Sequence, residues 1–292
     1  MTGDLGTIIT AMVTPFDGEL AVDHERLAGL ADELLASGSD GLVVAGTTGE
    51  SPTVGDDEKV AMFRTVVQAV GGRGKVIAGT GSNDTRHSVE LTKRAEAAGV
   101  DAALVVVPYY NKPPERGLLA HFRAVAAATD LPVIVYNIPG RCVVNLSPEA
   151  LAALSATENI VAVKQANPDL AQTERLRALC DLGLYAGNDD MLLDVLRRGG
   201  WGGICVASHV AGPQMATVAA RFKAGDERGA EALDERLHDL YRALFVTANP
   251  IPVKAALDLL GRGVGGCRLP LVEADGRERD VVAAALRDLG LL

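Results

Sequence analysis

The chain has 292 residues, of which 48% are hydrophobic and 23% charged, and its formal net charge is −10. This charge excludes sequence-independent binding to nucleic acid or to an anionic membrane, because both need a basic face, but it leaves room for an anionic small molecule held by a few local cations. The chain contains no run of 18 apolar residues, and its first residues, MTGDLGTIIT, lack the basic flank of a signal peptide. We therefore expect a cytoplasmic protein with no membrane span, long enough to form one large barrel domain.

Neither the cysteines nor the histidines are spaced for metal or redox chemistry. The cysteine spacings match no zinc motif and no CxxC pair, so we expect free, mostly buried thiols in a reducing compartment. The histidines form no HExxH motif or other ligand cluster, which predicts surface or structural positions and no metal site. These residues are Cys142, Cys180, Cys205 and Cys267, and His24, His87, His121, His209 and His238.

Eight short apolar runs recur along the chain and predict strands. They do not alternate cleanly between apolar and polar residues, which is typical of strands covered on both faces. Helical spacing follows in Asp23–Ser37, Asp56–Val70 and Asp84–Ala98, each opening on an aspartate that can act as N-cap. The predicted strands are Thr7–Val13, Gly41–Ala45, Lys75–Ala78, Ala102–Val107, Pro132–Tyr136, Ile160–Lys164, Leu184–Ala186 and Gly203–Ala207.

Alternation of eight strands with helices, at a spacing of about 30 residues, predicts a closed (β/α)8 TIM barrel. The alternative, an open doubly wound sheet, usually carries a GxGxxG turn after its first strand, whereas the first strand here leads into Val13-Thr14-Pro15-Phe16. We expect a barrel catalytic domain over residues 1–224 and a C-terminal helical domain over residues 225–292. The helices predicted after the last strand are Ala216–Lys223, Glu227–Val246, Pro252–Leu259 and Arg279–Leu289.

Polar residues follow five of the predicted strands. Barrels of this kind carry their active sites at the carboxyl ends of the strands, so these residues should converge on one mouth. The segments are Gly46-Thr47-Thr48-Gly49-Glu50, Pro108-Tyr109-Tyr110-Asn111, Tyr136-Asn137-Ile138-Pro139-Gly140-Arg141, Lys164, and Gly187-Asn188-Asp189-Asp190.

Lys164 is the most informative of these residues. It closes an apolar run, so burial should lower the pKa of its amine and leave a neutral nucleophile that can form an imine with a ketone. Tyr136 ends the preceding strand at a matching level, where its phenol could carry protons for that step. The alternatives are a lysine that extends to solvent and a tyrosine that only packs its ring.

Anion-binding groups are predicted beside them. Thr47 and Thr48 lie between glycines that let the backbone bend, and their amides and hydroxyls could hold a carboxylate. The guanidinium of Arg141, in a stiff turn, fits a carboxylate bidentately. An ordinary strand-to-loop turn and a surface salt bridge are the alternatives for these two sites.

Asp189 and Asp190 could suggest a metal, but they have no further ligands at useful spacing. We expect both to cap the helix Met191–Arg198 instead.

These motifs together resemble the dihydrodipicolinate synthase branch of the N-acetylneuraminate lyase family of class I aldolases, over nearly the whole chain. GTTGE and YNIPGR followed by a strand-end lysine are specific in combination, although each alone is weak. The segments that carry the resemblance are Ala11-Met12-Val13-Thr14-Pro15-Phe16, Gly46-Thr47-Thr48-Gly49-Glu50, Val107-Pro108-Tyr109-Tyr110-Asn111-Lys112-Pro113, Tyr136-Asn137-Ile138-Pro139-Gly140-Arg141, Val163-Lys164, Gly187-Asn188-Asp189-Asp190, Asn249-Pro250-Ile251-Pro252-Val253-Lys254 and Arg268-Leu269-Pro270.

The resemblance implies a lyase that condenses pyruvate with L-aspartate 4-semialdehyde to 4-hydroxy-tetrahydrodipicolinate, in diaminopimelate and lysine biosynthesis, with no cofactor. It further implies a homotetramer built as a dimer of dimers. The implied roles are imine formation for Lys164; a proton relay for Tyr136, Thr47 and Tyr110, the last donated across a dimer interface; pyruvate carboxylate binding for Thr48; semialdehyde carboxylate binding for Arg141; and backbone contacts for Gly187 and Ile204.

Arg141 distinguishes branches of the family, because sugar-acid lyases need residues that bind hydroxyl groups where this chain has a carboxylate-binding arginine. Another pyruvate-dependent aldolase, such as a 2-keto-3-deoxy sugar-acid lyase, remains the alternative within the enzyme class. A catalytically inactive barrel used for sensing is the alternative outside it.

The chain departs from the family pattern at two places. Asn188 replaces the first aspartate of a GDD segment, with little effect expected because the site uses the Gly187 backbone. In lysine-inhibited relatives two histidines and a glutamate lie where this chain has Asp56, Lys59 and His87. Because His87 cannot hold an α-ammonium as a carboxylate does, and Lys59 adds a like charge, we expect inhibition by L-lysine to be weak or absent.

Overall fold

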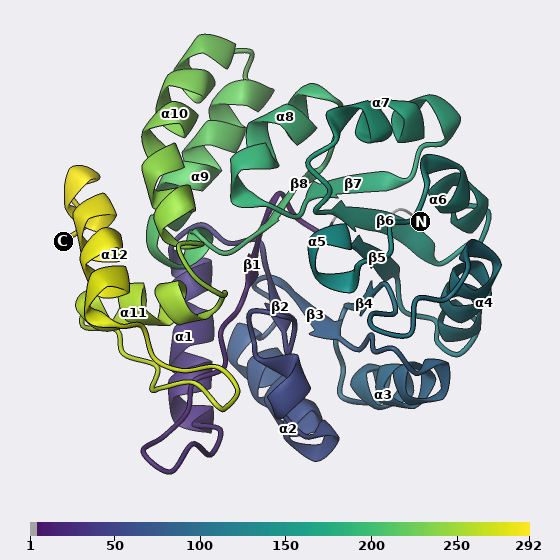
Figure 1. Ribbon diagram of the computed structural model, residues 1–292, viewed down its shortest axis with the longest axis horizontal. Coiled ribbons are helices and arrows are strands. Elements are labelled where there is room, and N and C mark those ends of the chain that lie inside the picture. The colour runs from purple at the N-terminus through teal and green to yellow at the C-terminus, as the bar shows by residue number, and fades with distance from the viewer. Residues whose placement is uncertain (1–4) are drawn as a thin grey trace.

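The computed structural model describes residues 5–292, and in this part of the chain eight parallel strands form one closed barrel in sequence order (Figure 1). Strand β8 pairs with β1 to close it, which confirms the predicted (β/α)8 fold. The signal-peptide expectation concerns a segment that begins with residues 1–4, which lie outside the described part. The strands are β1 (Ile8–Ala11), β2 (Gly41–Val44), β3 (Lys75–Gly79), β4 (Ala102–Val106), β5 (Val133–Asn137), β6 (Ile160–Gln165), β7 (Gly183–Ala186) and β8 (Gly202–Cys205).

Burial on both faces explains why the strands lack alternation. One set of side chains fills the barrel interior, among them Ile9, Val43, Ile77 and Ile134, each less than 2% exposed. The intervening side chains pack outward against the helices in larger hydrophobic clusters. Interior and exterior are therefore both apolar, as the continuous runs predicted.

The helices surround the barrel, and further helices follow its last strand (Figure 1). None of those in residues 5–292 has the length and hydrophobicity to cross a membrane. They are α1 (His24–Ala36), α2 (Asp56–Val70), α3 (Thr85–Ala97), α4 (Glu115–Ala126), α5 (Pro139–Cys142), α6 (Pro148–Leu154), α7 (Leu170–Leu179), α8 (Leu192–Arg197), α9 (Ser208–Lys223), α10 (Glu227–Ala243), α11 (Ile251–Leu259) and α12 (Gly276–Asp288), with short 3-10 helices η1 (Ser51–Thr53) and η2 (Asp189–Met191).

Two of the three predicted aspartate caps are present. Asp23 and Asp84 each accept a hydrogen bond from a backbone amide of the first turn of α1 and α3. The prediction for Asp56 is wrong: the N-cap of α2 is Gly55, whose amide donates to Glu58 over 2.8 Å. Asp56 is the first helical residue, and its carboxylate contacts His87 of α3 and Lys59 of α2.

The C-terminal helices pack onto the barrel. Helix α10 lies along α9, and α12 packs against α10 and α11 (Figure 1). Helix α9 begins well before the predicted residue 216, with a kink of non-helical backbone at Ala211 close to Pro213. Leu237, Val253 and Leu286 of the later helices belong to the same buried cluster as the barrel residues around Leu27.

A buried ion pair joins this extension to the loop that follows β2. Lys254 Nζ of α11 lies 2.7 Å from Glu50 Oε1, with side-chain exposures of 4% and 0%. The other carboxylate oxygen of Glu50 accepts the Arg268 amide over 2.9 Å, and Lys254 also donates to the Gly266 carbonyl over 2.7 Å. A charge pair buried in this way fixes geometry, because separating either partner would leave an uncompensated charge. The loop carrying Thr47 and Thr48 is therefore anchored from the C-terminal helices.

Candidate active site

Lys164 and Tyr136 lie side by side at the carboxyl end of the barrel. They are direct partners in the register of β6 and β5, and Lys164 Nζ lies 4.3 Å from the centre of the Tyr136 ring. Their exposed fractions are only 5% and 6%. The lysine therefore does not extend to solvent, and its amine is held against the phenol.

Burial changes the acid–base behaviour of both groups. It lowers the pKa of Lys164 to about 8, against smaller opposing effects from Cys205 and Asp189. Burial raises the pKa of Tyr136 to about 12, although the charge of Arg141 and a hydrogen bond with Thr47 act in the opposite direction. The site thus pairs an amine that is partly neutral near neutral pH with a phenol that keeps its proton.

The two threonines of the loop after β2 occupy different environments. Thr47 is half-buried and interacts with Tyr136, whereas Thr48 is buried and its hydroxyl oxygen accepts a hydrogen bond from Asn249 over 2.9 Å. The backbone of this loop turns at Ala45 and Glu50, both with φ near +55°. Gly46 and Gly49, which lie between these two positions, have no positive φ.

Arg141 lies in the short helix α5, and a network of amide side chains holds this turn in place. The Asn137 side chain donates to Asn145 over 2.8 Å and to Gln165 over 2.9 Å, and its side-chain amide oxygen accepts a hydrogen bond from the Leu146 backbone amide. Within residues 5–292 the Arg141 guanidinium is exposed and makes no hydrogen bond or ion pair with another side chain. It is therefore available for an anion. The sequence reasoning missed Asn137 and Asn145, because amides on separate segments carry no spacing signal.

Gly187 directly follows β7, and Ile204 lies in the neighbouring strand β8. The Gly187 amide donates to Gln165 over 2.8 Å, and a Cβ at this position would lie 2.6 Å from Ala166 Cβ. Because the backbone at Gly187 lies this close to Ala166, only glycine fits at this position. Ile204 is completely buried in the barrel interior.

The helix-cap prediction for Asp189 and Asp190 is wrong. Helix α8 has no side-chain cap. Asp189 is buried, and its carboxylate accepts the amides of Val206 and Ala207 over 2.8 and 2.7 Å. It therefore shapes the loop after β8 rather than the helix after β7. Burial raises its pKa, although both amide hydrogen bonds lower it.

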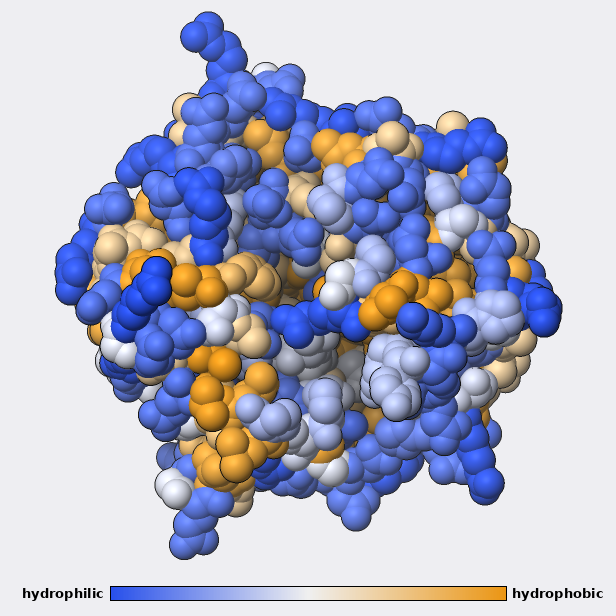
Figure 2. Space-filling model, in the orientation of Figure 1, coloured by the Kyte–Doolittle hydropathy of each residue, from blue (hydrophilic) through white to orange (hydrophobic). Residues whose placement is uncertain are grey.

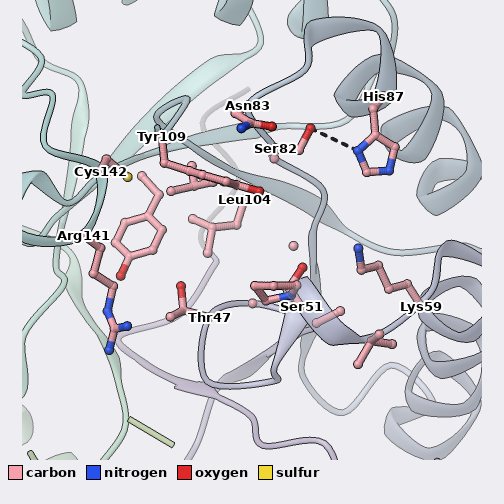
Figure 3. A pocket seen from close by; sticks show the side chains of 18 of the residues that line it. Thr47, Ser51, Lys59, Ser82, Asn83, His87, Leu104, Tyr109, Arg141 and Cys142 are labelled. Atoms are coloured by element: carbon pink, nitrogen blue, oxygen red, sulfur yellow. Dashed lines mark hydrogen bonds between the residues drawn. The ribbon is translucent and has the colours of Figure 1, made fainter. Parts of the chain in front are cut away.

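A cavity of about 510 Å³ opens beside these residues. Thr47 and Arg141 line one end of it, and Lys59 and His87 line the other (Figure 3). Tyr136 also lines the cavity. Figure 2 shows that the face bearing α5 is mostly hydrophilic, with hydrophobic patches, and is hollowed near its centre. The site residues that do not line the cavity are Thr48, Tyr110, Lys164, Gly187 and Ile204.

Tyr110 is the one predicted relay residue that points away from the others. Its side chain is 86% exposed, and its backbone has a left-handed φ of 73°. Such a conformation is uncommon for a tyrosine. Within one chain it does not join the Tyr136 and Thr47 pair.

Ion pairs occupy the far end of the cavity. Asp56 accepts from His87 Nε2 over 2.7 Å and lies 3.4 Å from the largely buried Lys59. His87 Nδ1 lies 3.0 Å from the Ser82 hydroxyl (Figure 3). Although its partial burial acts the other way, the hydrogen bond with His87 and the charge of Lys59 lower the pKa of Asp56 below its usual value. The Asp56 carboxylate is thus already engaged by the Lys59 ammonium and by a hydrogen bond with His87.

The four cysteines are free, three of them buried, as predicted. Residues 5–292 contain no group of three or more histidine, cysteine or acidic side chains arranged for a metal ion.

Fold and site together define a barrel lyase of the class I aldolase type, because a buried, partly neutral amine at the mouth of a parallel barrel can attack a carbonyl. The chain belongs to the dihydrodipicolinate synthetase family, which matches residues 4–289.

This chain matches similar proteins over nearly the whole length of both sequences. A 4-hydroxy-tetrahydrodipicolinate synthase from Moorella thermoacetica is 51% identical, covering 98% of this chain and 99% of the relative. The crystal structure of a Cyanidioschyzon merolae dihydrodipicolinate synthase with lysine bound superimposes with a TM-score of 0.97 at 45% identity, covering 99% of both chains. That of a chloride-inhibited dihydrodipicolinate synthase from Acinetobacter baumannii complexed with pyruvate gives a TM-score of 0.96 at 37% identity, covering 99% of this chain and 100% of the other.

Proposed function

We propose that this protein condenses pyruvate with L-aspartate 4-semialdehyde to form 4-hydroxy-tetrahydrodipicolinate, a step of diaminopimelate and lysine biosynthesis. The observation that carries the proposal is the buried Lys164 amine, with a pKa of about 8, held against Tyr136. A relative named for this activity, 51% identical over nearly the whole chain, supports it.

The chemistry balances without a further reactant. The neutral Lys164 amine adds to the pyruvate ketone, and loss of water gives an imine. The iminium accepts electrons, so the pyruvate methyl group loses a proton and the resulting enamine attacks the aldehyde carbon. The amino group of the semialdehyde then attacks the imine carbon, which closes the ring and returns the Lys164 amine.

Each site residue has a role in this scheme. Tyr136 and Thr47 would carry protons to and from the carbinolamine oxygen, since the phenol keeps its proton at neutral pH. Thr48 would bind the pyruvate carboxylate, and Arg141 the semialdehyde carboxylate through its free guanidinium. Gly187, directly after β7, and Ile204, within β8, would contact the substrate through their backbone.

A side-by-side assay tests the function. Turnover of pyruvate with aspartate semialdehyde should exceed turnover with sugar aldehydes by orders of magnitude, because Arg141 matches a second carboxylate. The Arg141→Met variant should lose this preference mainly through the KM for the semialdehyde. Faster reaction with a sugar aldehyde would instead favour a keto-deoxy sugar-acid lyase.

The pKa of Lys164 predicts a pH dependence. Burial lowers this pKa from 10.5 to about 8, so the neutral fraction at pH 7 is about 300-fold larger than for an exposed lysine. Because the neutral form is the nucleophile, the rate of imine formation should rise with pH up to about 8 and then level. Stopped-flow measurement of imine formation against pH checks this. A rate that kept rising to pH 10 would show an unperturbed amine.

We further propose that L-lysine inhibits this enzyme weakly or not at all. The charge of Lys59 opposes that of Asp56 at the far end of the cavity, and His87 hydrogen-bonds the same carboxylate, so an added ammonium group finds like charge and no free carboxylate. Steady-state rates at saturating substrates should stay unchanged at millimolar lysine. Half-maximal inhibition below one millimolar would contradict the proposal.

A triple variant provides a positive control for inhibition by L-lysine. Asp56→His, Lys59→His and His87→Glu together place two histidines and a glutamate at this end of the cavity and remove the buried cation. We expect this triple variant to gain inhibition by lysine while keeping the activity of the parent protein.

We also propose a homotetramer in the cytoplasm, with an active dimer as its minimum unit. The exposed Tyr110, with its left-handed backbone, supports a role in which the ring enters a second subunit and completes the proton relay there. Sedimentation equilibrium of the intact protein tests the assembly.

A further inference from the structure

Asn249, in the loop between α10 and α11, contacts Thr48, the threonine proposed to bind the pyruvate carboxylate, from a distant part of the chain. Its side-chain Nδ2 donates to Thr48 Oγ1 over 2.9 Å, across a separation of 201 residues. Asn249 and Thr48 are 6% and 3% exposed, so water competes poorly for this bond. None of the roles considered so far involves this residue.

The bond fixes which way the threonine hydroxyl points. A hydroxyl has one hydrogen and two lone pairs, and Asn249 occupies a lone pair of Thr48. Within residues 5–292 the Thr48 hydroxyl donates to no other group. Its hydrogen is therefore directed away from the amide and remains for a ligand, and a carboxylate is an acceptor-only group that would take it.

The amide itself is held rigidly. The segment that contains Asn249 leads into α11, where Lys254 is ion-paired with Glu50, two residues beyond Thr48. The amide oxygen of Asn249 is buried and has no partner in the described part of the chain. In the donor orientation the amide leaves its oxygen and one N–H unpaired, whereas the flipped amide would leave two N–H groups unpaired; because an unpaired carbonyl oxygen costs less than an unpaired N–H, the donor orientation toward Thr48 is favoured.

We propose that Asn249 is a positioning residue that sets Thr48 as a hydrogen-bond donor to the carboxylate of the keto acid substrate. The inference rests on the proposed function, since it assigns a cause to the polarity of the Thr48 hydroxyl. It also explains why the helical extension is joined to the barrel mouth at this loop. Asn249 acts through Thr48 and does not touch the reacting atoms.

Reversing the polarity of the bond tests the proposal. Asn249→Asp keeps the shape but can only accept, so the Thr48 hydroxyl must turn its hydrogen toward residue 249. We expect the pyruvate concentration for half-maximal borohydride trapping on Lys164 to rise about tenfold, with maximal trapping unchanged. If the amide oxygen instead accepted from Thr48 in the native protein, the half-saturation concentration would barely change and the proposal would be wrong.

A double-mutant cycle with Thr48→Val separates the hydroxyl from the added charge. The Asn249→Asp effect should fall to less than about threefold once the hydroxyl is absent. Equal fold-changes in both backgrounds would mean that Asn249 acts by charge or packing alone, and would overturn the proposal. Asn249→Ala, which adds no charge, should raise half-saturation about threefold in the parent and not at all beside Thr48→Val.

One control variant completes the design. Asn159→Asp places a carboxylate at a part-buried asparagine that donates to three backbone carbonyls. It precedes β6, whose other end carries Lys164, and it should lower the melting temperature without changing half-saturation. If Asn249→Asp does not fold, Asn249→Ala decides. If neither folds, Asn249 serves folding and the assignment fails.

The failure of the proposed function can be distinguished from the failure of this inference. Absence of borohydride trapping in the parent protein would refute the proposed function. Normal trapping in the parent, with Asn249→Asp raising half-saturation by the same factor with and without Thr48→Val, would refute this inference alone.

Discussion

Replacing Lys164 by alanine should reduce turnover by roughly 10⁴-fold or more, since no other nucleophile in the described site can form the imine. The amine is buried, lies 4.3 Å from the Tyr136 ring and has a pKa of about 8. Its loss removes the covalent step, which binding and proton transfer cannot replace. A coupled assay with pyruvate and aspartate semialdehyde measures the effect.

The matched control is Lys164→Arg. Arginine keeps the positive charge and nearly the length of lysine, but it stays protonated at any working pH and cannot form the imine. It should therefore lose as much activity as the alanine variant. Retained activity in either variant would show that another group is the nucleophile.

Replacing Tyr136 by phenylalanine should lower kcat by about 10²- to 10³-fold, the usual contribution of one proton-transfer group. The ring and its packing remain, so the half-saturation concentration of pyruvate should change little. The loss should be largest in kcat, because the phenol acts during carbinolamine formation and breakdown.

Tyr185→Phe is the control for that variant. Tyr185 is buried in the barrel interior as well, but its hydroxyl donates to the Gly6 carbonyl at the opposite end of the barrel. Its loss should leave kcat near the parental value. If both variants lost activity equally, the effect of Tyr136→Phe would reflect barrel stability and not proton transfer.

The barrel and the alignment of Lys164 with Tyr136 could be predicted because they depend on local patterns. Apolar runs that close on a polar residue mark both a strand and its carboxyl end, and β5 and β6 are consecutive in a parallel barrel. Eight such runs therefore predict one mouth and the residues around it. The division at residue 224 stays a prediction, since the buried cluster that includes Leu237 continues from the barrel into the later helices.

Contacts between distant segments could not be predicted in this way. The Asn249 bond to Thr48 and the Lys254 pair with Glu50 join residues about 200 positions apart, and no spacing rule connects them. The hydrogen bonds of Asp189 likewise could not be predicted from spacing in the sequence. An aspartate before a helix usually caps it, but here two amides of the loop after β8 are the better partners because the carboxylate is buried.

Reduction with borohydride in the presence of pyruvate, followed by peptide mapping, tests the central claim most directly. The buried amine should capture the keto acid, so a reduced pyruvate adduct should appear on the peptide that contains Lys164 and increase with pH toward about 8. A protein that gained no adduct, or gained it on another lysine such as Lys254, would contradict the account.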